Sequence, residues 1–152
     1  MRGRPAALAA SVVFALGSSV FLAPAARAIT KEACNQPVVV ARLAFGPGTI
    51  PRGGSSTARL SGRNCTRHPR TVTITWTGKF SGNGAVYCPA IDPLREQVNV
   101  PAASHLGASL RFVVPAACSA TTLTATARVT DARGKLIRLK TASLRIIQPR
   151  SS

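Results

Sequence analysis

Residues 70–80, RTVTITWTGKF, alternate apolar side chains with threonines. In an extended chain this period of two places Val72, Ile74 and Trp76 on one face and the threonines on the other. β-branched and aromatic residues suit a pleated, half-buried surface. The stretch therefore predicts a strand that packs Trp76 into a core and presents threonine to solvent.

The C-terminal part of the chain repeats this pattern. Residues 121–130 predict a strand whose apolar positions are Leu123, Ala125, Ala127 and Val129 and whose polar positions are Thr122, Thr124, Thr126 and Arg128. A turn over residues 131–134, DARG, leads into a last strand at 135–147, so the two strands form a hairpin. We expect a bulge near Thr141, with Ile137 and Leu139 inward before it and Ala142, Leu144 and Ile146 inward after it.

Four further strands are predicted between turn signals rich in glycine and proline, at residues 38–45, 57–62, 94–100 and 109–115. The first places Val39, Ala41, Leu43 and Phe45 on one face, the second turns Ala58 and Leu60 inward, and the last turns Leu110, Phe112 and Val114 inward. No convincing helix accompanies these strands. The chain is therefore predicted to be all-β, with seven short strands.

The N-terminus predicts export. Arg2 and Arg4 precede an apolar stretch, and Ala26-Arg27-Ala28 has the small-x-small form of a signal-peptidase site, so residues 1–28 are interpreted as a signal peptide. A membrane anchor is the alternative, but glycine and serines at residues 17–19 break the apolar run below the roughly 20 residues that span a bilayer. We therefore expect a secreted or envelope-associated mature protein without a transmembrane anchor. Its high arginine and alanine content favours a GC-rich bacterial source.

The strand pattern resembles the immunoglobulin-like and fibronectin-III-like sandwiches of secreted proteins. Trp76 on the third strand resembles the buried tryptophan on strand C of immunoglobulin domains. The chain departs from that family because no cysteine stands on the two strands that carry its inter-sheet bridge. The resemblance implies a single seven-stranded antiparallel sandwich over residues 29–152, while other seven- or eight-stranded β folds stay open.

The chain contains four cysteines, Cys34, Cys65, Cys88 and Cys118. In an exported chain they are expected to form two disulfides, for which three pairings exist. If successive strands run up and down, the first two cysteines lie at one end of the sandwich and the last two at the other. Because a disulfide needs Cα atoms within about 7 Å, this predicts Cys34–Cys65 and Cys88–Cys118. A zinc site of four thiolates is disfavoured because no Cys-x-x-Cys pair is present.

The charged residues are strongly unbalanced, with 20 Lys+Arg against 4 Asp+Glu and a formal net charge of +16. The residues suited to acid–base or metal chemistry are Glu32, Asp92, Glu96, Asp131, His68 and His105. They show no catalytic or metal-ligand spacing, and an ion pair with Arg95 is the expected role of the acids near it. The sequence therefore predicts a protein that is not an enzyme and holds no metal or cofactor.

The predicted third, sixth and seventh strands would share one sheet in an immunoglobulin-like arrangement. Their threonines would then cover one outer face, bordered by Arg128, Arg138, Lys140 and Arg145. Clustered cations attract polyanions, although threonine and arginine also simply keep exposed strands soluble. We expect a non-enzymatic binding module at or near the cell envelope, whose partner is an anionic envelope polymer or another exported protein. The scarcity of aromatic groups on this face disfavours nucleic acid as the ligand.

Residues 87–93, YCPAIDP, support a second hypothesis. They resemble the reactive-site loop of the subtilisin inhibitors secreted by streptomycetes, in which a Cys-Pro-x segment carries the bond presented to the protease. The resemblance implies that Ala90 is the specificity residue and Ala90–Ile91 the presented bond. The cysteine spacing elsewhere departs from that family, whose first two cysteines lie closer together. A proline-rich connecting loop is the alternative interpretation.

Overall fold

The computed structural model describes residues 34–82 and 85–147, which belong to one compact unit of the chain. These residues form β-strands and no helix, so the all-β prediction is confirmed for them. The strands are β1 (Val38–Gly46), β2 (Thr49–Pro51), β3 (Ser55–Asn64), β4 (Arg70–Ser81), β5 (Ile91–Val100), β6 (His105–Val113), β7 (Thr122–Asp131) and β8 (Leu136–Ile147). The signal peptide predicted at residues 1–28 lies outside the described residues.

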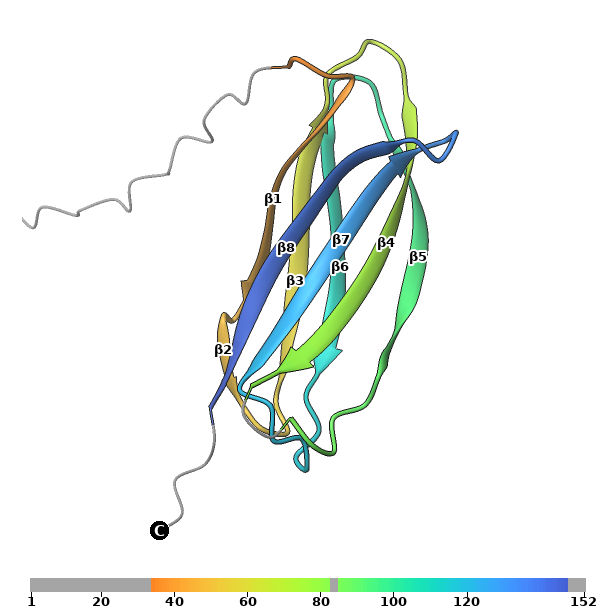
Figure 1. The fold of residues 1–152 in the computed structure, drawn as a ribbon. Coiled ribbons are helices and arrows are strands. Elements are labelled where there is room, and N and C mark those ends of the chain that lie inside the picture. The colour runs from red at the N-terminus through yellow and green to blue at the C-terminus, as the bar shows by residue number, and fades with distance from the viewer. Residues whose placement is uncertain (1–33, 83–84, 148–152) are drawn as a thin grey trace, which may run out of the picture. The chain divides into compact units, whose positions relative to one another are not determined.

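The strands form two sheets that face each other across a common core and curl around it (Figure 1). One sheet has three strands in the order β1-β3-β6, and the other has five in the order β2-β8-β7-β4-β5. Neighbouring strands run antiparallel, except that β2 runs parallel to β8. As predicted, β4, β7 and β8 are neighbours in one sheet.

The expected number of seven strands is wrong, because the described residues contain eight. The additional strand is β2, a three-residue element between two turn signals. It pairs only with Arg145, Ile146 and Ile147 near the other end of the sequence, and Ile50 at its centre is buried. Three residues are too few to show an alternating pattern, and their pairing partner lies far away in the sequence, so periodicity does not predict this strand.

The core consists of alternate residues from both sheets. Val72, Ile74 and Trp76 of β4 are at most 1% exposed, which confirms the predicted inward face of that strand. The inward residues predicted for β7 are also buried, and the small Ala127 lies directly beside the large Trp76 in the sheet. From the other sheet, the buried contributions include Ala58, Leu60, Leu106 and Phe112.

The inward face predicted for β1 is half wrong. Its register against β3 shifts between Val40 and Arg42, so the strand contains an irregularity at Ala41. Val38 and Val40 are therefore buried in place of the predicted Val39 and Ala41, whereas Leu43 is inward as predicted. Such a bulge adds one residue to a strand and reverses the side-chain phase beyond it.

The bulge predicted in β8 exists but lies elsewhere. The register against β7 shifts between Val129 and Thr130, opposite Ile137, while Thr141 pairs regularly with Thr126. Leu139 consequently points to the outer side and is 53% exposed, contrary to the prediction. Leu144 and Ile146 are buried as predicted, because they follow the regular part of the strand.

Both predicted disulfides are present. Cys34–Cys65 has a Cα–Cα distance of 5.7 Å, and Cys88–Cys118 one of 4.5 Å. The first bridge joins the chain just before β1 to the chain just after β3, and the second joins the loops that precede β5 and follow β6, at the other end of the strands. Two disulfides are consistent with an oxidising environment.

No helix long and apolar enough to cross a membrane occurs in residues 34–82 or 85–147.

Candidate anion-binding surface

The outer face of the five-stranded sheet is covered mainly by threonines. The register of β4 against β7 pairs Thr73 with Thr130 and Thr77 with Thr126, and cross-strand partners point to the same side of a sheet. The outward positions of these two strands are Thr71, Thr73, Thr75, Thr77, Lys79 and Ser81 on β4 and Thr122, Thr124, Thr126, Arg128 and Thr130 on β7. The predicted threonine surface is therefore present on these strands.

Arg95, Thr75 and Arg128 form one row across this face. Arg95 of β5 pairs with Thr75 of β4, which pairs on its other side with Arg128 of β7. Because strands lie about 4.8 Å apart, the backbones of the two arginines are roughly 10 Å apart with Thr75 between them. All three line a pocket of about 290 Å³, together with Thr73 and Thr130. Guanidinium and hydroxyl donors therefore surround one hollow.

The side chains of Arg95 and Arg128 make no ion pair or hydrogen bond with any described residue. Asp131 also lines the pocket, but its Oδ1 accepts hydrogen bonds from the backbone N–H groups of Arg133 and Lys135, both at 2.9 Å. These bonds hold that carboxylate oxygen in the turn between β7 and β8. Two unneutralised guanidinium groups above hydroxyls could bind a phosphate, sulfate or carboxylate group.

The structure divides the four cations predicted to border this face. Arg128 points outward beside Thr75, and Arg145 points outward beside Thr122. Lys140 instead pairs with Ala127 and Arg138 with Val129, both of which are buried. These two cations therefore lie on the core side of β8, at an edge that β2 does not cover. Their predicted place beside Arg128 is wrong, because the bulge in β8 precedes them instead of following them.

Sequence reasoning missed Arg95 as a residue of this face. It expected Arg95 to pair with a neighbouring acid, but alternation along β5 turns Arg95 outward and Glu96 inward. Glu96 Oε1 accepts a hydrogen bond of 2.7 Å from Nε1 of the buried Trp76. Alternation along β5 is enough to predict that Arg95 and Glu96 lie on opposite faces. It does not predict that β5 lies next to β4.

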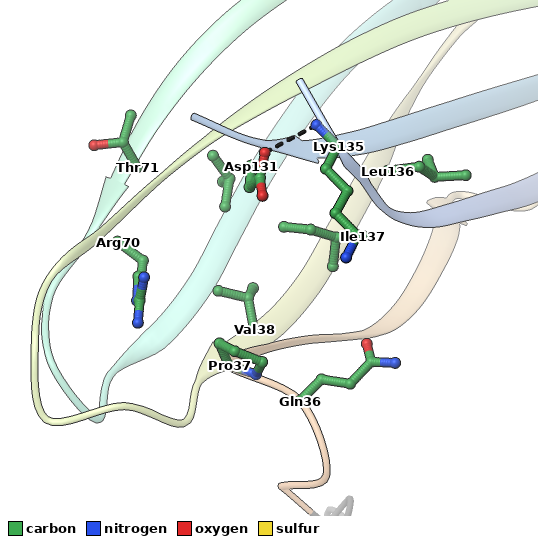
Figure 2. Close-up of a pocket in the computed structure, with 10 residues that line it drawn as sticks. Gln36, Pro37, Val38, Arg70, Thr71, Asp131, Lys135, Leu136 and Ile137 are labelled. Carbon is green, nitrogen blue, oxygen red and sulfur yellow. Dashed lines mark hydrogen bonds between the residues drawn. The ribbon is translucent and has the colours of Figure 1, made fainter. Parts of the chain in front are cut away.

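A second pocket, of about 340 Å³, opens where the start of β1 approaches the β7–β8 turn (Figure 2). Its apolar walls include Pro37, Val38 and Ile137, and its charged groups are Arg70, Lys135 and Asp131. Asp131 lines both pockets, so its carboxylate does not distinguish them. The difference lies in the other walls, which are largely apolar here and carry threonine hydroxyls between Arg95 and Arg128.

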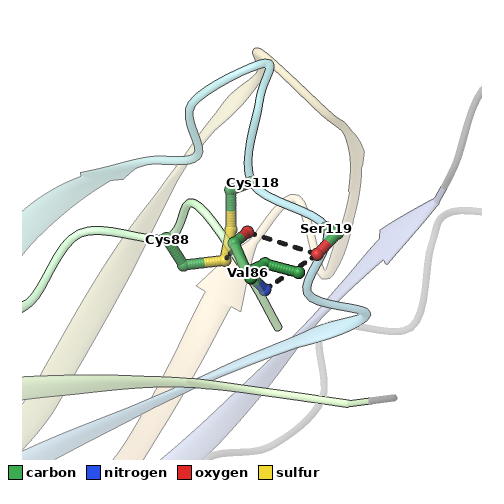
Figure 3. Close-up of a disulfide and its surroundings, with 4 residues drawn as sticks. All are labelled: Val86, Cys88, Cys118 and Ser119. Carbon is green, nitrogen blue, oxygen red and sulfur yellow. Dashed lines mark hydrogen bonds between the residues drawn. A yellow bond between two sulfur atoms is a disulfide. The ribbon is translucent and has the colours of Figure 1, made fainter. Parts of the chain in front are cut away.

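The segment proposed as an inhibitor loop is held by the second disulfide (Figure 3). Val86 N–H donates to Ser119 Oγ at 2.9 Å, and Ser119 N–H donates to Val86 O at 3.1 Å, beside Cys88–Cys118. Ala90 is exposed, but Ile91 begins β5 and packs against the core. A Cβ on Gly78 would come within 2.6 Å of Ile91 Cδ1, which shows how closely this side chain covers β4. Tyr87 is the most exposed large hydrophobic residue of the described part of this loop, at 81%.

The remaining candidates for chemistry stay apart. Within the described ranges, no group of three His, Cys, Asp or Glu side chains could hold a metal ion. Asn64 begins a glycosylation sequon, yet its side chain is fully buried. Its Nδ2 donates to the backbone oxygens of His68, Val100 and Pro101, and its Oδ1 accepts from Thr66. This amide is a structural element of the β3–β4 loop.

Comparison with known proteins identifies a fold and no family. No protein-family model matches the sequence, and no curated protein matches it. A DNA-bound alkylpurine DNA glycosylase from Pseudomonas fluorescens is similar in structure, with a TM-score of 0.51 and 8% identity over 73% of this chain and 30% of that chain. A β-glucosidase from Erythrobacter marinus has a TM-score of 0.54 and 7% identity, over 72% of this chain and 15% of that chain. A CARDB domain from Pyrococcus furiosus, in complex with di-metal ions, has a TM-score of 0.49 and 8% identity, over 72% of this chain and 90% of that chain.

The described domain thus spans less than a third of the glycosylase and of the glucosidase. At 7–8% identity the likeness concerns the fold alone.

Proposed function

We propose that this protein is an exported, non-enzymatic binding module that docks onto anionic polymers of the bacterial cell envelope. The observation that carries the proposal is the row of Arg95, Thr75 and Arg128 across one pocket, with neither guanidinium neutralised by a described residue. An anionic group on the polymer would lie between the arginines and accept hydrogen bonds from the threonine hydroxyls. Docking thereby uses charge-assisted bonds, which are about twice as strong as neutral ones.

Three further features support this proposal. The net charge is +16, and +13 (16 − 3) remains without Arg2, Arg4 and Arg27 of the predicted signal peptide. This charge favours encounter with polyanions over distances set by ionic strength. Two disulfides suit an exported protein, for which a signal peptide at residues 1–28 would provide the route. The three-stranded and five-stranded sheets, with β4, β7 and β8 adjacent, suit an immunoglobulin-like module.

The proposal is tested with short soluble fragments of an envelope polymer that each carry one phosphate. Nuclear magnetic resonance titration of the labelled protein should show the largest shifts at Arg95, Thr75 and Arg128. The double variant Arg95→Gln/Arg128→Gln should bind at least tenfold more weakly, which corresponds to about 1.4 kcal/mol.

The matched control is Arg138→Gln/Lys140→Gln. It removes the same formal charge from the opposite side of β8, and it should alter the dissociation constant less than about twofold, as expected of screened charges outside the site. Equal weakening in both variants would indicate nonspecific charge attraction. Inhibition of a subtilisin-like protease by the wild-type protein, lost on Ala90→Pro, would favour the inhibitor hypothesis instead.

A further inference from the structure

The outer face of the three-stranded sheet carries a second set of cations with a different spacing. Its register creates four successive outward rows: Gly46–Thr57–Arg111, Ala44–Arg59–Ser109, Arg42–Ser61–Gly107 and Val39–Arg63–His105. Each row contains one arginine, and all four arginines are exposed. We call Arg111, Arg59, Arg42 and Arg63 the arginine ladder.

The spacing of the ladder follows from strand geometry. Successive outward rows are two residues apart, or about 7 Å at the 3.4 Å rise of an antiparallel strand. Four rows therefore distribute four positive charges over about 20 Å along the sheet. Two of the arginines, Arg59 and Arg63, lie on the central strand β3, and the other two lie on the flanking strands, Arg111 on β6 and Arg42 on β1.

The surface between these arginines is open and free of acid. The outward positions of the four rows contain no aspartate or glutamate, and most of the remaining side chains are glycine, alanine, serine or threonine. A Cβ added to Gly107 would contact nothing within 4 Å. An extended chain could therefore approach the backbone closely beside Gly107.

Contacts within the protein orient two of the four guanidinium groups. Arg111 donates from Nε and Nη2 to Ser55 Oγ, at 3.1 and 2.8 Å. A Cβ on Gly46 would come within 2.7 Å of Arg59 Nη1, so the Arg59 side chain lies across β1 over that glycine. The side chains of Arg42 and Arg63 make no hydrogen bond or ion pair with a described residue. The ladder is thus partly preorganised, and none of its members is neutralised by a described carboxylate.

We propose that the arginine ladder binds an extended chain of phosphodiester-linked polyol or sugar units, with about one anionic group for each 7 Å row. The chain lies along β3, and each phosphate meets one guanidinium group. Phosphodiester chemistry matches the bidentate donors of arginine. The four rows contain no phenylalanine, tyrosine or tryptophan, and His105 at one end is their single ring, which favours a chain without bases to stack.

This inference rests on the proposed attraction to anionic envelope polymers, but it concerns the opposite sheet and a ligand of several charges. The pocket between Arg95 and Arg128 receives a single anionic group, whereas the ladder requires a chain. The two sites are therefore separable by the length of the ligand.

The test uses full-length mature protein carrying Arg95→Gln/Arg128→Gln, so that the ladder is measured without the pocket. Glycerol phosphate oligomers with one, two, four and eight phosphates serve as probes. Affinity should rise steeply up to four phosphates and only slightly beyond. For the longest oligomer, the logarithm of the association constant should fall with the logarithm of salt concentration at a slope of about −3, since each phosphate contact contributes about −0.7.

Adding Arg42→Gln/Arg63→Gln should reduce that slope by about 1.4, to roughly half. Adding Arg42→Lys/Arg63→Lys should preserve it, which separates loss of charge from loss of folding. Adding Arg138→Gln/Lys140→Gln instead is the charge-matched control and should leave the slope unchanged.

An equal reduction by the ladder variant and its control would overturn the ladder and indicate diffuse attraction. So would an affinity that does not depend on oligomer length. If the pocket variant binds single phosphates as the wild type does while the slope still depends on Arg42 and Arg63, the proposed function of the pocket fails and the ladder stands.

Discussion

The two sheets share one core and both present cations to solvent, yet they arrange them differently. On the five-stranded sheet, Arg95 and Arg128 occupy the same row, and the two neighbouring rows of β4 and β7 contain only threonine. On the three-stranded sheet, every row from Thr57 to Arg63 contains one arginine. The first arrangement concentrates charge at a point, and the second spreads it along a line.

This difference teaches that net charge does not define the ligand of a basic protein. Both arrangements contribute to the same value of +16, and either would enrich polyanions near the surface. The distances between cations decide whether one anionic group or a repeating chain is complementary to them. Those distances depend on how the strands pair, and the amino-acid composition does not determine strand pairing.

The two sheets also differ in their buried polar groups. The three-stranded sheet ends at Asn64, whose side chain joins β3 to the loop after β5 and to the β3–β4 loop. In the five-stranded sheet, the indole of the buried Trp76 donates one hydrogen bond to Glu96 on the neighbouring strand. The Asn64 side chain therefore bonds β3 of one sheet to the end of β5 in the other, whereas the Trp76–Glu96 bond satisfies one donor within a single sheet.

Replacing Asn64 should have the largest effect on stability. Asn64→Ala leaves three backbone oxygens without this donor and removes the acceptor of Thr66, so we expect a loss of about 3–5 kcal/mol in the free energy of unfolding. Urea denaturation under non-reducing conditions measures it. Asn99→Ala, at an exposed outward position of β5, is the control and should change the free energy by less than about 0.5 kcal/mol. Similar losses in both variants would remove the distinction between the sheets.

Removing one disulfide at a time tests whether the two ends of the strands are equivalent. The bridges span 31 and 30 residues, and the chain-entropy model gives about 3–4 kcal/mol for each. Cys34→Ala/Cys65→Ala and Cys88→Ala/Cys118→Ala should therefore lower stability by similar amounts, as measured by urea denaturation. A much larger loss for the second pair would show that packing around the fully buried Cys118 contributes as well.

Glu96 should have a smaller effect than Asn64. Glu96→Leu leaves the indole N–H of Trp76 without its acceptor, and we expect a loss of about 1–3 kcal/mol. Glu96→Gln keeps an acceptor oxygen and should retain most of the stability. Thermal unfolding, with tryptophan fluorescence as the probe, distinguishes the two. Equal losses would show that the carboxylate acts by its charge and not as a hydrogen-bond acceptor.

The outer faces should have the smallest effect on folding. Arg95→Gln/Arg128→Gln and Arg42→Gln/Arg63→Gln remove exposed side chains without a described partner, so each should change the free energy of unfolding by less than about 0.5 kcal/mol. Denaturation curves that coincide with the wild-type curve would confirm it. A substantial loss in either variant would mean that those arginines stabilise the fold instead of serving a ligand.

Local patterns of the sequence predict the central strands well. Thr71 to Thr77 and Thr122 to Thr126 alternate without interruption, so β4 and β7 and their inward faces follow from period alone. The disulfides are also predictable, because their pairing requires only the direction of successive strands. The predicted inward faces are wrong where a bulge of one residue shifts the side-chain alternation, at Ala41 in β1 and at Ile137 in β8.

The candidate surfaces were less predictable for the same reason. The outward positions of Arg128 and Arg145 follow from alternation, whereas the positions of Arg138 and Lys140 do not, because the bulge in β8 lies before them at Ile137 and not near Thr141. Arg95 joins Arg128 only because β5 and β7 flank β4, and the arginine ladder exists only because β1 and β6 flank β3. A sequence contains the residues of each strand but not the neighbours that complete a row.

The bridge between Cys34 and Cys65 also determines how the domain bears a pulling force. β1 lies entirely within the covalent loop that this bridge closes, so tension entering at Cys34 passes through the sulfur atoms to the end of β3. β3 is paired along its length with β1 and β6, and β1 cannot be peeled away first. At the other end of the strands, Ile147 finishes β8 (Figure 1). Force applied between these two points acts along β3 and β8, so the hydrogen bonds of each strand to its neighbours are loaded together in shear. Because the two strands lie in different sheets, the load also passes through the packed core between them.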